Sequence, residues 1–437
     1  MAFYLPGVHV PHRKNTANMS AVKMNTPKTV VIPMSMHIGA PATPVVKVGD
    51  HVDIGTLIGE QNGVVSSPVY SSVSGTVKKI DDFLLSQGEN SQAIVIESDG
   101  ENTVSDTVKA PVVNTREDFI EAVKQSGIVG LGGAGFPTYV KFGLGEKLDI
   151  DQLIINGAEC EPYITSDSVT MVNDVDDIKY ALETMIKLLE IKEVIIGIEK
   201  NKPQAIDAMK KIVESNDKIS VKILPSLYPQ GGEKVLVYHT TGKVIETGKL
   251  PIDVGCVVCN STTVATIGKY LKTGMPLVEK VVTVDGGAVA EPKNVIAPIG
   301  TAMSDVFEFC GGFKSEPDRV VYGGPMMGVA VPDTDAPILK NTNAILALTA
   351  KETKAPKQTA CINCGKCANV CPFGIDPRAI AKAYKGKDAE ALEKAGVETC
   401  MLCGCCSFTC PASRMIVQNN KLAKDFLKDE KQKEANK

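Results

Sequence analysis

The sequence predicts a multidomain α/β protein, and three observations support this fold class. The chain has 437 residues, and at roughly 150 residues per domain this length predicts about three domains. The apolar pattern changes along the chain from short runs broken by Gly and Pro to alternating strand-like and helix-like segments. Nine of the 13 cysteines lie between Cys361 and Cys410, which predicts a separate metal-binding domain rather than a disulfide framework.

Composition and charge exclude several classes of protein. Hydrophobic residues make up 43% of the chain and charged residues 22%, as in an ordinary globular protein. Lys and Arg number 47 against 51 Asp and Glu, and because there is no basic block we expect no nucleic-acid binding. No apolar run approaches the ~18 residues of a spanning helix, and residues 1–6 lack a signal-peptide pattern. We therefore expect a soluble, unexported protein without direct membrane insertion.

The N-terminal part of the chain is expected to form an arm followed by a small β module. Residues 1–30 are polar and irregular in pattern, whereas residues 31–105 contain short apolar runs separated by Gly and Pro, which is typical of an all-β module. Residues 46–52 and 71–77 resemble the barrel-sandwich hybrid family, which includes lipoyl and biotinyl carriers. Because no lysine stands between Gly63 and Val77, the carrier attachment point is missing and we expect a structural or docking role.

Residues 110–272 are predicted to form a Rossmann-like α/β domain. Residues 153–155, 194–196 and 221–224 are typical of strands. Between the first two, apolar residues recur at helical spacing: Val175, Ile178, Ala181, Leu182, Met185, Ile186 and Leu189. A second helix is expected to begin at Pro203. This β-α-β-α-β order predicts a parallel sheet with right-handed crossovers.

Three further segments complete the expected organisation. Residues 275–348 are expected to form a small strand-helix-strand insert, with strands at 281–284 and 320–322 around a helix at 305–309. A linker rich in Lys, Thr and Pro leads to the cysteine-rich domain, which we place at residues 355–418. Residues 419–437 are expected to form a helical tail.

The cysteine spacing predicts two [4Fe-4S] clusters. The pattern Cys-x-x-Cys-x-x-Cys-x-x-x-Cys-Pro occurs twice, at Cys361 and at Cys400. In two-cluster ferredoxins the fourth Cys of each run ligates the other cluster. This gives two ligand sets: Cys361, Cys364, Cys367 and Cys410, and Cys400, Cys403, Cys406 and Cys371. Two zinc ribbons or a disulfide framework are the alternatives, and Cys405 is either a bystander or a ligand in place of Cys406.

A glycine-rich loop is the second candidate site. Residues 130–135 fit the pattern GxGxxG, which alone is weak evidence for dinucleotide binding. The dinucleotide fingerprint needs a strand before the loop and a helix after it, but here a helical segment precedes the loop and Phe136-Pro137 follows it. A plain connector is therefore an open alternative, although backbone N–H groups of such a loop can approach a phosphate closely.

The residues after the loop carry a resemblance to a known family. Residues 130–142, 156–162 and 228–233 resemble, in this order, the flavin- and NADH-binding subunit of respiratory complex I. The resemblance implies FMN as cofactor and NAD(H) as substrate. It implies a catalytic set of Phe136, Glu161 and Glu233, and a cofactor-binding set of Gly130, Gly132, Gly133, Lys141, Asn156, Glu159, Tyr228, Gly231, Asn260 and Thr263. The carboxylates are solvated surface groups in the alternative interpretation.

The sequence departs from that family at four positions. Ala158 stands in place of an acid, Gly232 in place of one of two adjacent glutamates, and Leu131 and Phe142 in place of an arginine and a tryptophan. Nucleotide affinity is the property that these changes affect, and Ala158 and Gly232 favour an alternative function, an electron-wire or adaptor subunit that binds clusters but no nucleotide. A flavin subunit of a soluble hydrogenase or formate dehydrogenase is a third candidate, against which stand the C-terminal clusters and the N-terminal β module.

The complete order of domains narrows the resemblance. A barrel-sandwich module, a flavin domain, a β-grasp-like insert and a C-terminal two-cluster ferredoxin domain together resemble the C subunit of the Rnf (Rsx) electron-transport complex. This resemblance implies a peripheral subunit on the cytoplasmic face of the membrane. It would exchange hydride between NAD(H) and FMN and pass single electrons through its clusters to or from an ion-pumping complex. Expected partners are the membrane subunits, including a ferredoxin-like one. Either direction of electron flow and either Na⁺ or H⁺ as coupled ion are compatible with it.

Overall fold

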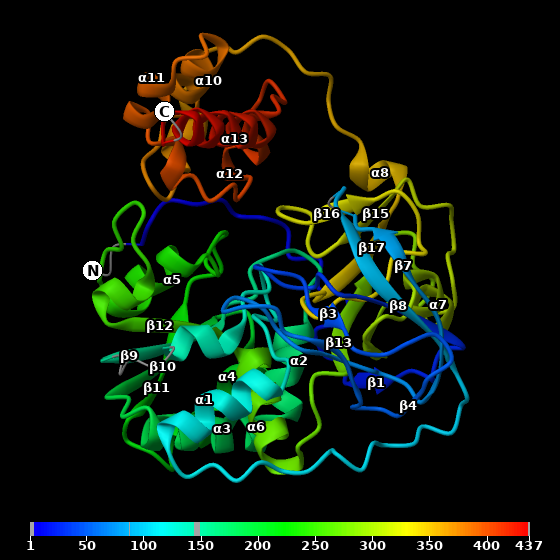
Figure 1. Cartoon of the computed structure of the whole chain (residues 1–437). Helices are drawn as coiled ribbons and strands as arrows, with labels where there is room; N and C mark the ends of the chain where they lie inside the picture. Colours follow the sequence, from blue (N-terminus) through cyan, green and yellow to red (C-terminus); the bar gives the residue numbers. More distant parts are fainter. Residues whose placement is uncertain (1–3, 87, 144–148, 436–437) are drawn as a thin grey trace.

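The protein is a chain of four structural parts, seen here in a computed structural model (Figure 1). The structure describes residues 4–86, 88–143 and 149–435. The strands of these residues form four sheets. No helix in these ranges combines the length and the apolar character that crossing a membrane requires.

The N-terminal β module consists of two antiparallel sheets. The first has the order β2-β8-β7-β4 and the second the order β3-β5-β6. Their bounds are β2 Thr29–Pro33, β3 Thr43–Pro44, β4 His51–Val52, β5 Leu57–Glu60, β6 Val69–Tyr70, β7 Gly75–Leu84 and β8 Asn90–Ser98. Fully buried side chains from both sheets, among them Ile32, Ile58 and Ile94, form the core between them. Burial of this apolar area stabilises strands that are too short to persist alone.

The α/β domain is built on a four-stranded parallel sheet with the order β11-β10-β9-β12. Its strands are β9 Gln152–Gly157, β10 Glu193–Glu199, β11 Ile219–Leu224 and β12 Cys256–Asn260. The chain runs outward from β9 to β10 and β11, then returns to place β12 on the other side of β9. The carboxyl ends of β9 and β12 therefore form a topological switch point, which is where ligands bind in open α/β sheets.

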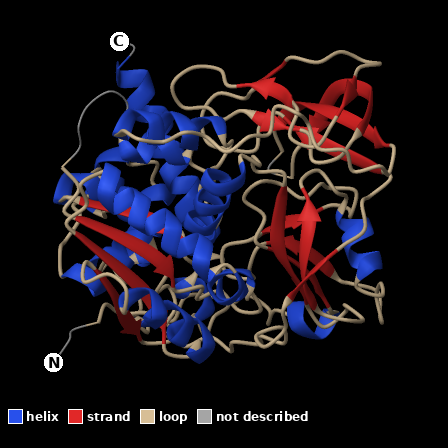
Figure 2. Ribbon diagram, turned by 90° about the horizontal axis from the view of Figure 1, so that it is seen from below, coloured by secondary structure: helices blue, strands red, loops and turns tan. Residues whose placement is uncertain are grey.

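Helices surround this sheet, as Figure 2 shows. They are α1 Arg116–Gln125, η1 Thr138–Phe142, α2 Ser166–Asn173, α3 Val175–Leu188, α4 Pro203–Val213, α5 Glu233–Thr241, η2 Pro251–Val254 and α6 Ser261–Thr273. Helix α3 buries the apolar face that its spacing predicts, including Leu182 and Met185. Helix α4 begins with Pro203 at its first position, as predicted, because proline needs no hydrogen-bond acceptor there.

The insert forms a six-stranded sheet with the order β1-β14-β13-β17-β15-β16. Its elements are β1 Ala21–Lys23, β13 Glu279–Asp285, β14 Lys293–Pro298, α7 Met303–Phe309, β15 Arg319–Tyr322, β16 Val329–Val331, β17 Ala344–Leu348 and α8 Ala350–Thr353. Strand β1 comes from the segment expected to be an irregular arm, and it pairs in parallel with β14. Three residues are too few for a periodic pattern, so this pairing left no signal in the sequence.

The cysteine-rich domain is a small helical unit. It contains α9 Lys366–Asn369, α10 Pro377–Lys385, α11 Ala389–Lys394, η3 Val397–Thr399, α12 Cys405–Phe408 and α13 Ile416–Ala435. Helix α13 begins before the tail predicted from residue 419 and buries Asn420, Ala423 and Leu427 against the rest of this domain. Figure 1 shows the domain beside α5, reached by a long connection from α8.

Candidate functional site

The candidate site lies at the switch point of the α/β sheet. Asn156 at the end of β9 is paired in register with Asn260 at the end of β12. The glycine loop passes close to this pair, because a side-chain carbon placed on Gly132 would lie 2.3 Å from Nδ2 of Asn260. Only glycine fits this approach. The fold thus brings the loop and both strand ends together, as the sequence predicted only through a resemblance.

The glycine loop is closed by its own backbone and tied to two neighbours. The N–H of Gly130 donates to the carbonyl of Phe136 at 2.8 Å, and the N–H of Leu131 donates to Oγ1 of Thr263 at 3.0 Å. Nδ2 of Asn341, from the insert, donates to the carbonyl of Gly133 at 3.1 Å. Residues 132–134 remain exposed. The loop therefore presents backbone, without bulky side chains, beside the switch point.

Positive charge and a helix N-terminus converge on the same place. Nζ of Lys141 donates to the carbonyl of Val258 at 2.9 Å and lies 3.8 Å from Oε1 of Glu233. Helix α6 begins at Ser261, with Asn260 as its N-cap, and the N-terminus of a helix attracts anions. Oγ of Ser261 is buried without a hydrogen-bond partner among the described residues. These groups fit the phosphate of a flavin nucleotide.

The acidic turn after β9 meets the turn before α5. Nδ2 of Asn156 donates to the carbonyl of Gly231 at 2.9 Å, and the N–H of Gly231 donates to Sγ of Cys160 at 3.3 Å. Glu233 begins α5 and remains exposed. The predicted residues Asn156, Gly231 and Glu233 are therefore neighbours, although they are far apart in the sequence.

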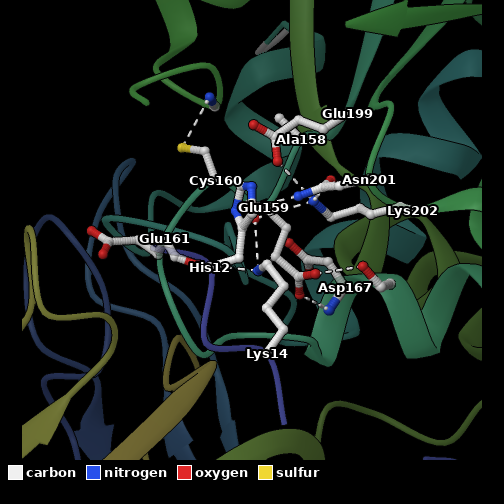
Figure 3. A network of polar contacts seen from close by, with 12 residues as sticks. His12, Lys14, Ala158, Glu159, Cys160, Glu161, Asp167, Glu199, Asn201 and Lys202 are labelled. Atoms are coloured by element: carbon white, nitrogen blue, oxygen red, sulfur yellow. Dashed lines mark hydrogen bonds and ion pairs between the residues drawn. The ribbon is translucent and has the colours of Figure 1, made fainter. Parts of the chain in front are cut away.

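The carboxylate of Glu159, predicted to contact the nucleotide, is instead bound by residues at the start of α2. Its carboxylate accepts hydrogen bonds from the backbone N–H of Asp167 at 2.7 Å and from Oγ of Ser168 (Figure 3). Burial raises the pKa of this carboxyl. Asp167 in turn accepts from Nδ2 of Asn260 at 2.7 Å and from Oγ1 of Thr262 at 2.6 Å. Glu159 thus supports the start of α2, and α2 supports Asn260.

Glu161 contacts the insert. Its two carboxylate oxygens accept hydrogen bonds from the backbone N–H groups of Met326 and Met327, at 3.0 Å and 2.9 Å. These methionines lie in the turn between β15 and β16. Burial raises the pKa of Glu161 to about 7, because a desolvated carboxylate is costly even with two donors. Figure 3 shows Glu161 pointing away from the neighbouring lysines. Its predicted catalytic role stays a prediction.

Tyr228 joins the candidate flavin site to the second cysteine loop. Its buried hydroxyl donates to the carbonyl of Cys403 at 2.7 Å, and the thiol of Cys405 faces the carbonyl of Tyr228 at 3.7 Å. A side-chain carbon on Gly232 would lie 2.5 Å from Cε of Met401. The turn at residues 228–233 therefore packs directly against the loop at residues 400–406.

The thiols of the second ligand set lie close together. Burial raises the pKa of the Cys406 thiol to about 12, and the neighbouring thiols that raise it further are those of Cys403, Cys400 and Cys371. This grouping agrees with the crossed ligand assignment, which stays a prediction. In the first loop, Cys361 and Cys364 are exposed. No group of three or more His, Cys, Asp or Glu in the described ranges is arranged to hold a single metal ion.

Several residues at the site were not found by sequence reasoning. Asp167 orients Asn260, Lys14 binds the acidic turn, and Asn420 in α13 donates Nδ2–H to Sγ of Cys400 at 3.5 Å. Each acts on a residue far away in the sequence, so no local pattern marks it.

Comparison with known proteins identifies the family. Three curated proteins are similar over most of their length. The C subunit of the Na(+)-translocating ferredoxin:NAD(+) oxidoreductase complex of Acetobacterium woodii is 42% identical over 382 residues, which are 86% of this chain and 86% of that protein. The chain belongs to this family of C subunits. The corresponding protein of the proton-translocating complex of Clostridium ljungdahlii is 42% identical over 85% of this chain and 82% of its own. The C subunit of an ion-translocating oxidoreductase complex of Rhodobacter capsulatus is 37% identical to this chain. The alignment covers 97% of this chain and 83% of that protein.

Family models match all four parts of the chain. They are the RnfC barrel sandwich hybrid domain at residues 4–101, the Nuo51 FMN-binding domain at 123–269, the SLBB domain at 281–330 and the 4Fe-4S dicluster domain at 355–412. The predicted fold class, family, FMN and two clusters are thereby confirmed. Among solved structures, an NAD+-reducing [NiFe]-hydrogenase in the H2-reduced state aligns with a TM-score of 0.48 and 19% identity. The alignment covers 72% of this chain and 63% of that chain.

Proposed function

We propose that the switch point of the α/β domain is the place where this oxidoreductase subunit exchanges hydride between NAD(H) and FMN. The observation that carries this proposal is the convergence of the glycine loop, Lys141 and the N-terminus of α6 on the paired strand ends at Asn156 and Asn260. Bound there, FMN supplies the chemistry that connects a two-electron hydride donor to one-electron carriers.

The residues at the switch point divide the task of binding. Lys141 and the hydroxyl of Ser261, which has no hydrogen-bond partner in the part of the chain that the structure describes, provide charge and a hydrogen bond for a phosphate at the start of α6. Gly132 allows the loop to approach Asn260 closely, and Gly133, where a side-chain carbon would meet nothing within 4 Å, leaves room for a flat ring system beside the backbone. Phe136, Glu161 and Glu233 are proposed to contact the nicotinamide nucleotide. None of these side chains has to act as an acid or a base, since alignment and exclusion of water are sufficient for hydride transfer.

The packing of the two cysteine loops supports a proposal for the order in which electrons pass through the two clusters. The loop at residues 400–406 packs against Tyr228 and Gly232 of the flavin domain, so its cluster is proposed to exchange electrons with the flavin site. The loop at residues 361–367 has exposed thiols, so its cluster is proposed to exchange electrons with partner proteins. Held by these two ligand sets, the clusters would supply one-electron transfer across the small domain.

The partners are proposed from the names of the relatives. Those proteins are subunits of ion-translocating ferredoxin:NAD(+) oxidoreductase complexes, so we propose that this chain docks onto membrane subunits of such a complex, including a ferredoxin-like subunit. A peripheral position on the cytoplasmic face fits this role, since NAD(H) is the substrate. The expectation that nucleic acid is not a partner remains part of this proposal.

Reduction of ferricyanide by NADH tests the proposed function. The anaerobically isolated chain should contain FMN and about eight iron atoms, as two [4Fe-4S] clusters require. It should reduce ferricyanide with NADH, and Cys364→Ala should retain this activity while losing iron and electron delivery to the partner subunits. A Cys364→Ala protein that keeps its flavin but no longer reduces ferricyanide would contradict the division between hydride exchange and electron transfer.

A further inference from the structure

A lysine from the N-terminal segment enters the acidic turn of the α/β domain. Nζ of Lys14 donates to the carbonyl oxygens of Glu159 and Glu161, both at 3.1 Å, and to the carbonyl of Ile164 (Figure 3). None of these three acceptors is a carboxylate. The side chain of Lys14 is half-buried, and burial is the main effect that lowers its pKa. Lys14 thus uses its ammonium to bind the backbone of the turn at residues 159–164.

The turn needs such support because of its backbone conformation. Glu159 has a φ of 46° and Tyr163 a φ of 69°, which is the left-handed region that residues other than glycine adopt only at a cost. Such conformations persist where the surrounding structure holds them from several sides. Here the N-terminal segment does so, since the N–H of Tyr163 also donates to the carbonyl of His12 at 2.8 Å.

A second lysine supports the same turn from the side of the sheet. Lys202 lies almost fully buried beyond the end of β10 and forms an ion pair with Glu199 at 2.8 Å. Its Nζ also reaches the carbonyl of Glu159 at 3.3 Å. Lys202 has its own carboxylate partner, whereas Lys14 is committed to carbonyl groups. Of the two lysines, Lys14 is therefore the one whose hydrogen bonds all stabilise the backbone conformation of the turn.

We infer that Lys14 is a positioning residue for the flavin and NAD(H) site, because it holds the acidic turn whose Cys160 accepts from the N–H of Gly231 and whose Glu159 supports α2 and, through Asp167, Asn260. The inference rests on the proposed function of the switch point. It assigns the N-terminal segment a task in substrate binding, although that segment lies outside the matched FMN-binding domain. Removing Lys14 would leave three carbonyl groups without this donor and would let the strained turn relax.

A neighbouring cavity makes chemical rescue possible. The cavity has a volume of about 90 Å³ and is open to solvent. Lys14 and Lys202 line it together with Ser168, Asn173 and Asn201. In a Lys14→Ala variant, the missing atoms correspond to n-propylammonium. This cation could enter through the cavity and donate to the same carbonyl groups.

The test compares Lys14→Ala with a matched control, Lys23→Ala, in the complete chain with its flavin and clusters. Lys23 lies in the same N-terminal segment, but its ion pair with Glu279 is at the surface. In NADH-dependent ferricyanide reduction, Lys14→Ala should raise KM for NADH about tenfold, since it loses hydrogen bonds to a charged group. Its kcat should change less and its iron content not at all. Lys23→Ala should behave as wild type.

Rescue distinguishes positioning from general stability. Added n-propylammonium should lower the KM of Lys14→Ala toward the wild-type value, whereas tetramethylammonium, which has no N–H donor, should not. If Lys14→Ala loses its flavin, rebinding of FMN with and without n-propylammonium replaces KM as the readout.

The results distinguish a failure of the positioning role of Lys14 from a failure of the proposed function. Wild-type kinetics in Lys14→Ala would overturn the inference, and so would a defect that n-propylammonium does not reverse. Wild-type protein that binds FMN but does not oxidise NADH would refute the proposed function instead. In that case FMN binding by the Lys14→Ala variant, with and without n-propylammonium, would judge the positioning role alone.

Discussion

The two cysteine loops have the same spacing but different surroundings. In the loop that begins at Cys361, two of the three thiols are exposed, and Ile362 between them has 67% of its surface in solvent. In the loop that begins at Cys400, Cys403 and Cys406 are buried, and Tyr228 binds the backbone of this loop. The spacing decides that each loop holds a cluster. The packing brings the second loop against the flavin domain, and on this contrast we base the proposal that the cluster of the first loop faces a partner.

The charge around the exposed loop extends this contrast. The whole chain has a formal net charge of −4. Lys357 and Lys366 nevertheless flank the first loop in the sequence and are exposed, and Asp376 is the sole acid between residues 357 and 378. Positive charge around an exposed cluster steers an acidic partner toward it. The buried loop contacts the flavin domain of the same chain, so the electron exchange that we propose there needs no such steering.

The largest expected effect is the loss of one cluster, and it tests whether the two loops exchange their fourth ligands. Cys371→Ala should remove the cluster of the buried loop, although Cys371 follows the exposed loop in the sequence. Cys410→Ala should remove the cluster of the exposed loop. Iron should fall from about eight to about four atoms per chain in both variants. Electron paramagnetic resonance identifies the remaining cluster. Loss of the exposed-loop cluster in Cys371→Ala would show that the ligands are not crossed.

The second prediction uses the difference in exposure between the loops. An iron chelator under mild oxidation should remove iron from the wild-type chain in two phases. The fast phase should account for about half of the iron and come from the loop with exposed Cys361 and Cys364. NADH-dependent ferricyanide reduction should persist through the fast phase, because it does not need that cluster. Release of all iron in one phase would mean that exposure does not distinguish the clusters.

Much of this molecule could be predicted from the sequence, for physical reasons that differ between its parts. Ligand spacing within a short loop is a local property, so the two clusters could be predicted directly, and the eight cysteines as their ligands stay a prediction. The strand and helix periods of the α/β domain are also local, and the order of its elements predicts a parallel sheet. The roles of Lys141 and the glycines of the loop come only from the resemblance to a flavin subunit and stay predictions.

The partners of individual side chains could not be predicted in this way. Glu159 and Glu161 belong to one acidic turn, but the first supports α2 and the second binds the turn between β15 and β16. Tyr228 reaches the cluster domain rather than only the flavin site. Each of these contacts joins segments whose relative position depends on the tertiary structure. A sequence pattern contains no information on such contacts unless it is local.

The third prediction concerns the potential of the buried-loop cluster. Nδ2–H of Asn420, on helix α13, points at Sγ of Cys400. A hydrogen bond to a ligand sulfur stabilises the more negative, reduced cluster. Asn420→Leu should therefore shift the midpoint potential of this cluster to a more negative value and leave the other unchanged. A redox titration followed by electron paramagnetic resonance measures both, with the exposed Lys421→Ala as control. Equal shifts of both potentials would indicate a general disturbance of the domain.

The smallest expected effect is a pH dependence at the junction of the buried loop. Glu161 binds the turn that contains Met326, and a side-chain carbon on Gly404 of the buried loop would lie 3.1 Å from the carbonyl of Met326. Burial raises the pKa of Glu161 from 4.5 to about 7. The folded state therefore binds this proton more tightly than the unfolded state does. The resulting stability is fully present below pH 4.5 and is lost as the pH rises through 7.

Between about pH 6 and about pH 8 the wild-type chain should lose roughly 1 kcal/mol of stability through Glu161. Glu161→Gln does not titrate, so its stability should change less over the same range. Denaturant midpoints of the two proteins at both pH values measure the difference. Within the described part of the chain, the Glu161 carboxylate is bound by Met326 and Met327 and not by the exposed loop, so the rate of iron release from that loop should not follow the titration. A wild-type midpoint that rises with pH, or an equal change in Glu161→Gln, would show that Glu161 does not couple the buried loop to pH.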